Sequence, residues 1–198
     1  MTLVTENILN AAKTGHQASV NHVVRQWYPR IYNFSYKYFS DHDLAMDTTQ
    51  KTFISMYQNL KNLKENGKFT QWLYQIAFNS CKEESRKQKR RRVFPFLKIT
   101  SKKDGKQLLE TFTEDLPDTD FEKQELGVIL HQALNKINEE QRIVVIMKEY
   151  EGFKFREIAE ILQISENTVK ARMYYGLNAL RKILEKWNIN QETVRYEL

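Results

Sequence analysis

The segment spanning residues 165–186 carries side chains that can bind a polyanion, and they recur at the spacing of one helix face. The segment holds five Lys or Arg residues against two Glu residues, a net charge of +3, and no carboxylate occurs from 167 to 184. Hydrogen-bonding and cationic groups without acidic neighbours suit the phosphates and base edges of a DNA groove. With a helical period of about 3.6 residues, the outward face is predicted to consist of Asn167, Thr168, Lys170, Ala171, Tyr174, Tyr175 and Asn178.

Two short amphipathic helices are predicted to position this face. The first begins near Phe155, and the second begins at Ser165, whose hydroxyl can accept a hydrogen bond from a free amide of the first turn. A short helix, a tight turn and then a helix with a polar and basic outer face are typical of a helix-turn-helix, whose second helix enters the major groove of DNA. Two packed helices with a solvated face are the alternative, but such a face usually mixes both signs of charge. The inward residues are predicted to be Ile158, Ala159, Ile161 and Leu162 in the first helix and Val169, Met173, Leu177, Leu180 and Leu184 in the second.

Positive charge is concentrated in the first half of the chain. The whole chain of 198 residues has a net charge of +6, and residues 1–92 hold 15 Lys or Arg against 7 Asp or Glu, whereas residues 119–198 hold 12 against 13. A basic domain favours a polyanionic partner, and nucleic acid is favoured over a membrane. The single Cys81 predicts neither a disulfide framework nor a zinc cluster. With no signal peptide and no run of 18 apolar residues, a soluble cytoplasmic protein is expected.

Helical periodicity dominates the chain, and strand signals are few. The predicted fold is all-α, with two small helical domains at residues 1–92 and 119–189. A flexible linker is predicted at residues 93–118, where periodicity is lost among Pro, Ser, Lys and Gly residues, and a short tail follows at 190–198.

Three helical segments are predicted in the first domain, at residues 6–38 with interruptions near Gly15 and Pro29, at 41–63 and at 69–92. In the second domain, Asn138 with a glutamine three residues later predicts the start of a helix. The inward face of the second segment is predicted to be Leu44, Phe53, Ile54, Tyr57 and Leu60.

Aromatic and basic side chains alternate through the first domain. This composition suits single-stranded nucleic acid, where each base stacked on an aromatic ring gains about 1–3 kcal/mol. Such rings more often form the core of a domain, and that is the expectation for Trp27, Phe53 and Trp72. The basic run at residues 86–92 can contact phosphates or can be a solvated helix end.

Three motifs resemble those of the extracytoplasmic-function sigma factors. Residues 69–79, FTQWLYQIAFN, resemble the family's FxxWLYRIARN, and residues 41–53, DHDLAMDTTQKTF, resemble its DAEDLVQETF segment. Residues 158–172, IAEILQISENTVKAR, are similar to EIAEILGISEGTVKSR. The motifs occur in the family's order around a linker of suitable length, and together they cover about 160 of the 198 residues.

The resemblance implies a dissociable promoter-specificity subunit of bacterial RNA polymerase. By position, Asp47 and Gln50 would meet the clamp helices of the largest polymerase subunit. The loop at 62–68 would hold a flipped base of the −10 element. Residues expected at the −10 strand are Asn62, Asn66, Lys68, Asn79, Lys82 and Arg86, and those expected at the −35 duplex are Asn167, Thr168, Lys170, Ala171, Arg172, Tyr174 and Tyr175.

The partners that the resemblance implies are core RNA polymerase, through the clamp helices and the flap of its two large subunits, and promoter DNA. An anti-sigma factor or another recruiting protein is expected as a third partner. No catalytic residue, metal or cofactor is implied. An ordinary helix-turn-helix repressor or activator is a second interpretation. A recombinase is a third, which would need a nucleophilic Ser or Tyr with clustered arginines on an α/β domain.

The sequence departs from the family pattern at four places. Lys51 stands where the family usually has an acid, and Met46 replaces another acid, which suggests a different tuning of the polymerase contact. Gln163 replaces the usual turn glycine, which costs about 1 kcal/mol if its φ is positive. The pair at residues 174–175, Tyr-Tyr, replaces a common His-Arg and predicts an altered −35 sequence preference.

Overall fold

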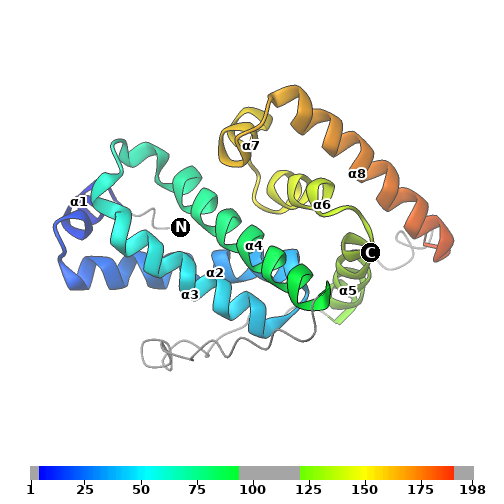
Figure 1. Ribbon diagram of the computed structural model, residues 1–198, viewed down its shortest axis with the longest axis horizontal. Helices are drawn as coiled ribbons and strands as arrows, with labels where there is room; N and C mark the ends of the chain where they lie inside the picture. Colours follow the sequence, from blue (N-terminus) through cyan, green and yellow to red (C-terminus); the bar gives the residue numbers. More distant parts are fainter. Residues whose placement is uncertain (1–4, 94–120, 190–198) are drawn as a thin grey trace.

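The computed structural model describes residues 5–93 and 121–189. The predicted tail lies outside these residues, and so does the predicted linker except for Val93. Within the described part every regular element is helical, and the helices form two groups that pack against each other (Figure 1). The prediction of an all-α protein with two small helical domains is therefore confirmed.

The first domain contains four α-helices. They are α1 (Glu6–Lys13), α2 (Gln17–Phe39), α3 (His42–Asn59) and α4 (Phe69–Val93), and α3 packs against both α2 and α4. Two 3₁₀ turns, η1 (Leu60–Asn62) and η2 (Asn66–Lys68), connect α3 to α4. Completely buried apolar side chains from the three long helices form the core, among them Val23, Ile31, Phe34, Met56, Leu73 and Ala77.

Helix α2 continues through Pro29, so the predicted interruption there is wrong. Proline cannot donate the intrahelical hydrogen bond and normally kinks a helix. Here the turns on both sides are anchored in the core, with Trp27 8% exposed and Ile31 and Phe34 completely buried. Tertiary packing of this face stabilises the helix more than the missing donor destabilises it.

The buried face of α3 differs from the predicted one. Ile54 and Tyr57 are 49% and 53% exposed, so their assignment to the core is wrong. Two larger apolar residues, Phe53 and Met56, lie on the buried face. The other residues of that face are small or hydroxylated: Ala45, Thr48, Thr49 and Thr52. The Thr49 and Thr52 hydroxyls donate to the carbonyls one turn earlier, at 2.7 and 2.8 Å. Threonine can be buried in this way because the helix backbone satisfies its hydroxyl.

The second domain contains α5 (Phe121–Lys136), α6 (Glu139–Val145), the π-helical turn η3 (Ile146–Tyr150), α7 (Phe155–Leu162) and α8 (Glu166–Lys186). Two predicted helix starts are confirmed. The Asn138 side chain accepts from the backbone amide of Glu140 at 2.8 Å, and Ser165 Oγ accepts from the amide of Thr168 at 3.0 Å. Each cap satisfies a donor that the first helical turn leaves free.

The buried stripe of α8 includes a glycine in place of a predicted leucine. Leu177 is 46% exposed, so its assignment to the core is wrong, whereas Val169, Met173 and Gly176 are buried. Gly176 lies against α6, and a Cβ atom on it would come within 3.1 Å of Val145 Cγ2 and 3.3 Å of Gln141 Cβ. The close approach of the two helices sets the register of α8.

We expect Gln163→Gly to raise the free energy of unfolding by about 1 kcal/mol. Gln163 ends α7 in the left-handed conformation, with φ 56° and ψ 46°, which strains any residue that has a Cβ atom. Urea unfolding followed by circular dichroism measures the difference. Gln163→Ala is the matched control, since it keeps the Cβ atom and the strain, and equal stability of the two variants would contradict the prediction.

Candidate functional site

The helix-turn-helix presents one face of α8 to solvent, at the far side of the second domain (Figure 1). Tyr174 and Tyr175 are 64% and 60% exposed, and their rings meet edge to face with centroids 5.5 Å apart. Lys170 is exposed and pairs with Glu166 one turn earlier, at 2.7 Å. The predicted residues that share this exposed face are Asn167, Lys170, Ala171, Tyr174 and Tyr175.

Two of the predicted −35 residues have partners inside the domain. The Arg172 guanidinium lies toward α6, where its Nη2 donates to the Glu140 carboxylate at 2.7 Å, and its side chain is 24% exposed. The Thr168 hydroxyl lies 2.8 Å from the hydroxyl of the capping Ser165. The structure therefore separates these two side chains from the open face of α8.

The loop between α3 and α4 forms one wall of a pocket of about 220 Å³. Of the predicted loop residues, Asn62 and Lys68 are exposed, and Asn66 is half-buried with its amide donating to Asn10 Oδ1 at 2.8 Å. Trp72 is half-buried and lines the pocket, so its assignment to the core is only partly right, whereas Trp27 and Phe53 are buried.

Helix α4 carries a polar and basic stripe beyond this pocket. Asn79, Lys82 and Arg86 are all exposed, and their spacing of three and four residues places them on one side of the helix. The Lys82 ammonium lies 5.9 Å from the centre of the Phe78 ring. An aromatic ring beside cations at one helix surface can contact both the bases and the phosphates of a single strand.

The exposed side of α3 is a third surface, which the sequence predicted only in part. Asp47 is exposed and Gln50 half-buried, and around them Met46, Ile54 and Tyr57 are 46%, 49% and 53% exposed. Residues 46, 50, 54 and 57 follow one helix face, so the surface is an apolar stripe with a polar edge. This spacing is visible in the sequence, but the prediction places Ile54 and Tyr57 in the core and only residues 46, 47 and 50 near the polymerase contact. A helical partner can pack against such a stripe.

Lys51 has a role inside the domain. Its ammonium lies 2.9 Å from the carboxylate of Glu84, whose side chain is 9% exposed, and the pair joins α3 to α4. A buried carboxylate without a partner is costly, so the lysine at this position compensates Glu84. The departure from the family pattern at this position thus has a local electrostatic reason.

Two family models match the chain, one in each group of helices. The family described as Sigma-70 region 2 matches residues 23–91, which include α3 and the polar and basic stripe of α4. The family described as Sigma-70, region 4 matches residues 127–180, which include α7 and most of α8. The chain is 29% identical to the ECF RNA polymerase sigma factor SigW of Bacillus subtilis over 189 residues, which is 93% of this chain and 98% of that protein. The chain belongs to the sigma-70 family, in its extracytoplasmic-function group.

A further relative and two solved structures are similar to the chain over most of their length. The RNA polymerase sigma-H factor of Pseudomonas aeruginosa is 24% identical over 184 residues, covering 91% of this chain and 93% of that protein. A solved structure of CnrH in complex with the cytosolic domain of CnrY has a TM-score of 0.64 at 17% identity, over 93% of this chain and 99% of that one. RpoE of Bartonella quintana in complex with the anti-sigma factor NepR has a TM-score of 0.60 at 20% identity, over 83% and 96%.

Sigma factors, the family to which this chain belongs, are not enzymes. Among the described residues, no helix has both the length and the apolar character that crossing a membrane requires.

Proposed function

We propose that this sigma factor binds core RNA polymerase, brings it to promoters with matching −10 and −35 elements, and initiates transcription there. The observation that carries the proposal is the presence of both sigma regions in order on one chain, each with an exposed face suited to its partner. The protein would act in the cytoplasm with the polymerase.

Three surfaces take separate roles in this proposal. The outer face of α8 binds the −35 duplex through Asn167, Lys170, Ala171, Tyr174 and Tyr175, with Thr168 and Arg172 at its margin. The loop residues Asn62, Asn66 and Lys68 and the stripe Asn79, Lys82 and Arg86 bind the separated −10 strand. Asp47 and Gln50, with the apolar residues of α3, bind the polymerase. The two domains are residues 1–92 and 119–189.

The proposal includes a protein that controls access of the sigma factor to polymerase. One structure of similar fold is the sigma factor RpoE in complex with the anti-sigma factor NepR, and another is CnrH in complex with the cytosolic domain of CnrY. An anti-sigma factor of comparable kind, or a recruiting protein that delivers the sigma factor to its promoters, would bind this chain.

The test is transcription of a promoter library with a randomised −35 element by polymerase reconstituted with the purified protein. Tyr174 and Tyr175 each offer one hydroxyl and a flat ring, and neither can form the bidentate contact that arginine makes with guanine. We expect Tyr175→Arg to shift the preferred sequence toward guanine at one or two positions, with discrimination of about 1–3 kcal/mol. Lys170→Ala should weaken all sequences alike and flatten the salt dependence, because it removes a phosphate contact.

Two results would count against this assignment. Identical preferred sequences for the wild type and Tyr175→Arg would show that Tyr175 does not read bases. If the wild-type protein did not direct core polymerase to any library member at low salt, the result would contradict the proposed sigma-factor function itself.

A further inference from the structure

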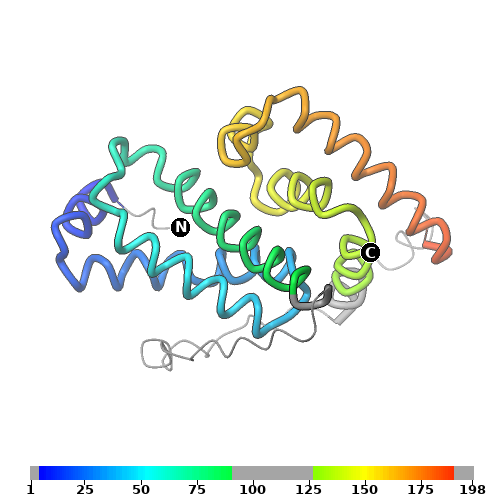
Figure 2. Tube along the Cα trace, viewed as in Figure 1, coloured from blue at the N-terminus to red at the C-terminus, as the bar shows by residue number. Residues whose placement is uncertain are grey.

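Helix α1 and the beginning of α2 precede the part of the chain that the Sigma-70 region 2 family matches, which starts at residue 23. Helix α1 packs against α2 and η1, at the end of the first domain where α3 leads into α4 (Figure 2). Its side chains Leu9 and Ala12 are each 4% exposed and belong to the core of that domain. Helix α1 therefore lies directly beside the loop to which we assign the −10 strand.

Two polar side chains of α1 bond this loop at two separate points. The Lys13 ammonium donates to the backbone carbonyl of Leu63 at 2.6 Å. The Asn10 Oδ1 accepts from the side-chain amide of Asn66 at 2.8 Å. Asn10 and Lys13 are three residues apart, so both lie on the side of α1 that meets the loop. One bond holds the end of η1 and the other the start of η2, and together they span the middle of the loop.

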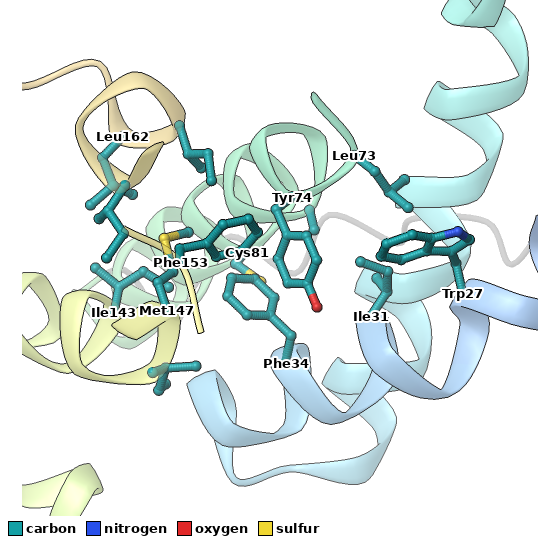
Figure 3. Packing of buried hydrophobic residues seen from close by; sticks show 14 of the residues in the cluster. Trp27, Ile31, Phe34, Leu73, Tyr74, Cys81, Ile143, Met147, Phe153 and Leu162 are labelled. Carbon is teal, nitrogen blue, oxygen red and sulfur yellow. The ribbon is translucent and has the colours of Figure 1, made fainter. Parts of the chain in front are cut away.

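Apolar packing fixes only the two ends of the loop. Leu63 and Phe69 are 8% and 3% exposed, and Phe69 packs edge-on against Trp27 of α2, with ring centroids 5.7 Å apart. Figure 3 shows Trp27 in the same buried cluster as Leu73 of α4. Residues 64–68, in contrast, bury no apolar side chain. The hydrophobic core therefore does not determine the shape of the middle of the loop.

The middle of the loop also has few stabilising bonds of its own. The Lys68 amide donates to the Glu65 carbonyl at 3.1 Å, and the side chains of these two residues form an exposed ion pair at 3.4 Å. Such exposed pairs contribute little. The Asn66 Oδ1 is buried, and no described group donates to it. A buried acceptor without a donor destabilises the conformation that contains it, so this shape of the loop depends on the bonds from α1.

We propose that Asn10 and Lys13 are positioning residues for promoter opening, which hold the loop in the shape that receives the flipped −10 base. The proposal rests on the function proposed above, since that function assigns the loop to the −10 strand. Without the two bonds the loop adopts other shapes, and only the fraction of molecules in the receiving shape reads the base. The bonds from α1 thus set how strictly this position of the promoter is selected.

Two double variants of equal charge isolate the contribution of the hydrogen bonds. Asn10→Leu/Lys13→Met keeps side chains of similar size but removes the acceptor and the donor. Asn10→Asp/Lys13→Arg keeps both, because a carboxylate accepts from an amide and a guanidinium donates to a carbonyl. Each lowers the net charge by one relative to the wild type. Asn7→Leu controls for an added apolar side chain on α1, since Asn7 is exposed and its side chain has no partner among the described residues.

Hydrogen exchange of the free, full-length protein measures the positioning directly. We expect the amides of residues 61–68 to exchange about tenfold faster or more in Asn10→Leu/Lys13→Met than in Asn10→Asp/Lys13→Arg. The reason is that each lost bond shifts the local opening equilibrium by about fivefold or more. Amides of residues 73–81, in the buried part of α4, should exchange alike in both variants and in Asn7→Leu. This measurement needs neither DNA nor polymerase.

The consequence for promoters is measured by transcription from a library randomised at the −10 element, with polymerase reconstituted with each variant. Molecules whose loop has another shape can open the DNA without reading the flipped base. The ratio between the best and the worst base at one −10 position should therefore fall by about fivefold in Asn10→Leu/Lys13→Met relative to Asn10→Asp/Lys13→Arg, the factor for one lost hydrogen bond. The preferred −35 sequence should be the same for all variants. A loss of fold would lower transcription without changing the ranking of −10 bases.

Equal exchange of the loop amides in the two double variants would overturn the proposal, because α1 would then not hold the loop. Faster exchange with unchanged selectivity at every −10 position would also overturn it, because the shape of the loop would not decide which base is read. If Asn10→Leu/Lys13→Met does not fold, Asn10→Leu against Asn7→Leu makes the same comparison with a single bond and at equal charge. Absence of transcription by the wild type would instead contradict the proposed function, and the exchange result would be read independently of it.

Discussion

Replacement of Ile54 and Tyr57 by alanine is expected to weaken binding to core RNA polymerase by about a hundredfold or more. Both side chains are about half exposed on α3, in a stripe with Met46 and beside Asp47 and Gln50. Large side chains at the centre of an interface each contribute about 2 kcal/mol or more when they are fully desolvated by the partner. Titration of labelled core polymerase with the purified variant measures the affinity.

The stability of this double variant should stay within about 0.5 kcal/mol of the wild type, because neither side chain packs in the core. Val128→Ala is the matched control, since Val128 is 55% exposed on α5 and its loss removes a comparable apolar surface elsewhere. Asp47→Ala with Gln50→Ala should weaken binding by a smaller factor. Unchanged affinity of the Ile54/Tyr57 variant would show that α3 is not the surface that polymerase binds.

A second large effect is expected at Gly176. Gly176→Leu should lower the free energy of unfolding by about 2 kcal/mol, since overpacking a closed interface costs about 1–3 kcal/mol or more. The first added carbon already comes within 3.1 Å of Val145 Cγ2, and leucine adds three further atoms. The better helix propensity of leucine returns about 0.8 kcal/mol and does not compensate. Urea unfolding followed by circular dichroism measures the change.

The neighbouring residue provides the control for this prediction. Leu177→Ala removes a larger side chain, but Leu177 is 46% exposed and its loss should change stability by less than about 0.5 kcal/mol. The stabilities of Gly176→Leu and Leu177→Ala together distinguish the register of α8 in the structure from the register that the sequence predicts. A destabilised Leu177→Ala together with a stable Gly176→Leu would favour the predicted register.

Several features of this protein follow from local sequence. The helix-turn-helix is predicted because Ser165 can cap α8 and because Ile158, Ile161, Leu162, Val169 and Met173 recur at helical spacing, and the structure buries all five. Capping and periodicity depend on residues within one or two turns of each other, so they can be read without the fold. The cationic faces of α4 and α8 can be predicted in the same way, because they too follow from the helical spacing of nearby residues.

The choice between two faces of a helix, in contrast, depended on tertiary neighbours. In α3 the apolar Ile54 and Tyr57 are exposed while Thr48 and Thr52 are buried, because a close helix contact requires small side chains there. In α8 the contact with α6 requires Gly176 in the same way. Hydrophobicity ranks side chains by the free energy of exposing them to water. It carries no information on how closely a neighbouring helix approaches.

The sequence by itself determined most of the helices, the caps at Asn138 and Ser165 and the positions of the cationic faces, but not the continuity of α2 through Pro29. Only the tertiary structure decided which face of α3 and α8 is buried, and that Tyr74 of α4 meets Glu151 and Phe153. The Tyr74–Glu151 bond joins residues 77 positions apart. Such a pairing leaves no periodic signal in either segment, because its free energy arises only when both domains have folded and exclude water from the contact between them.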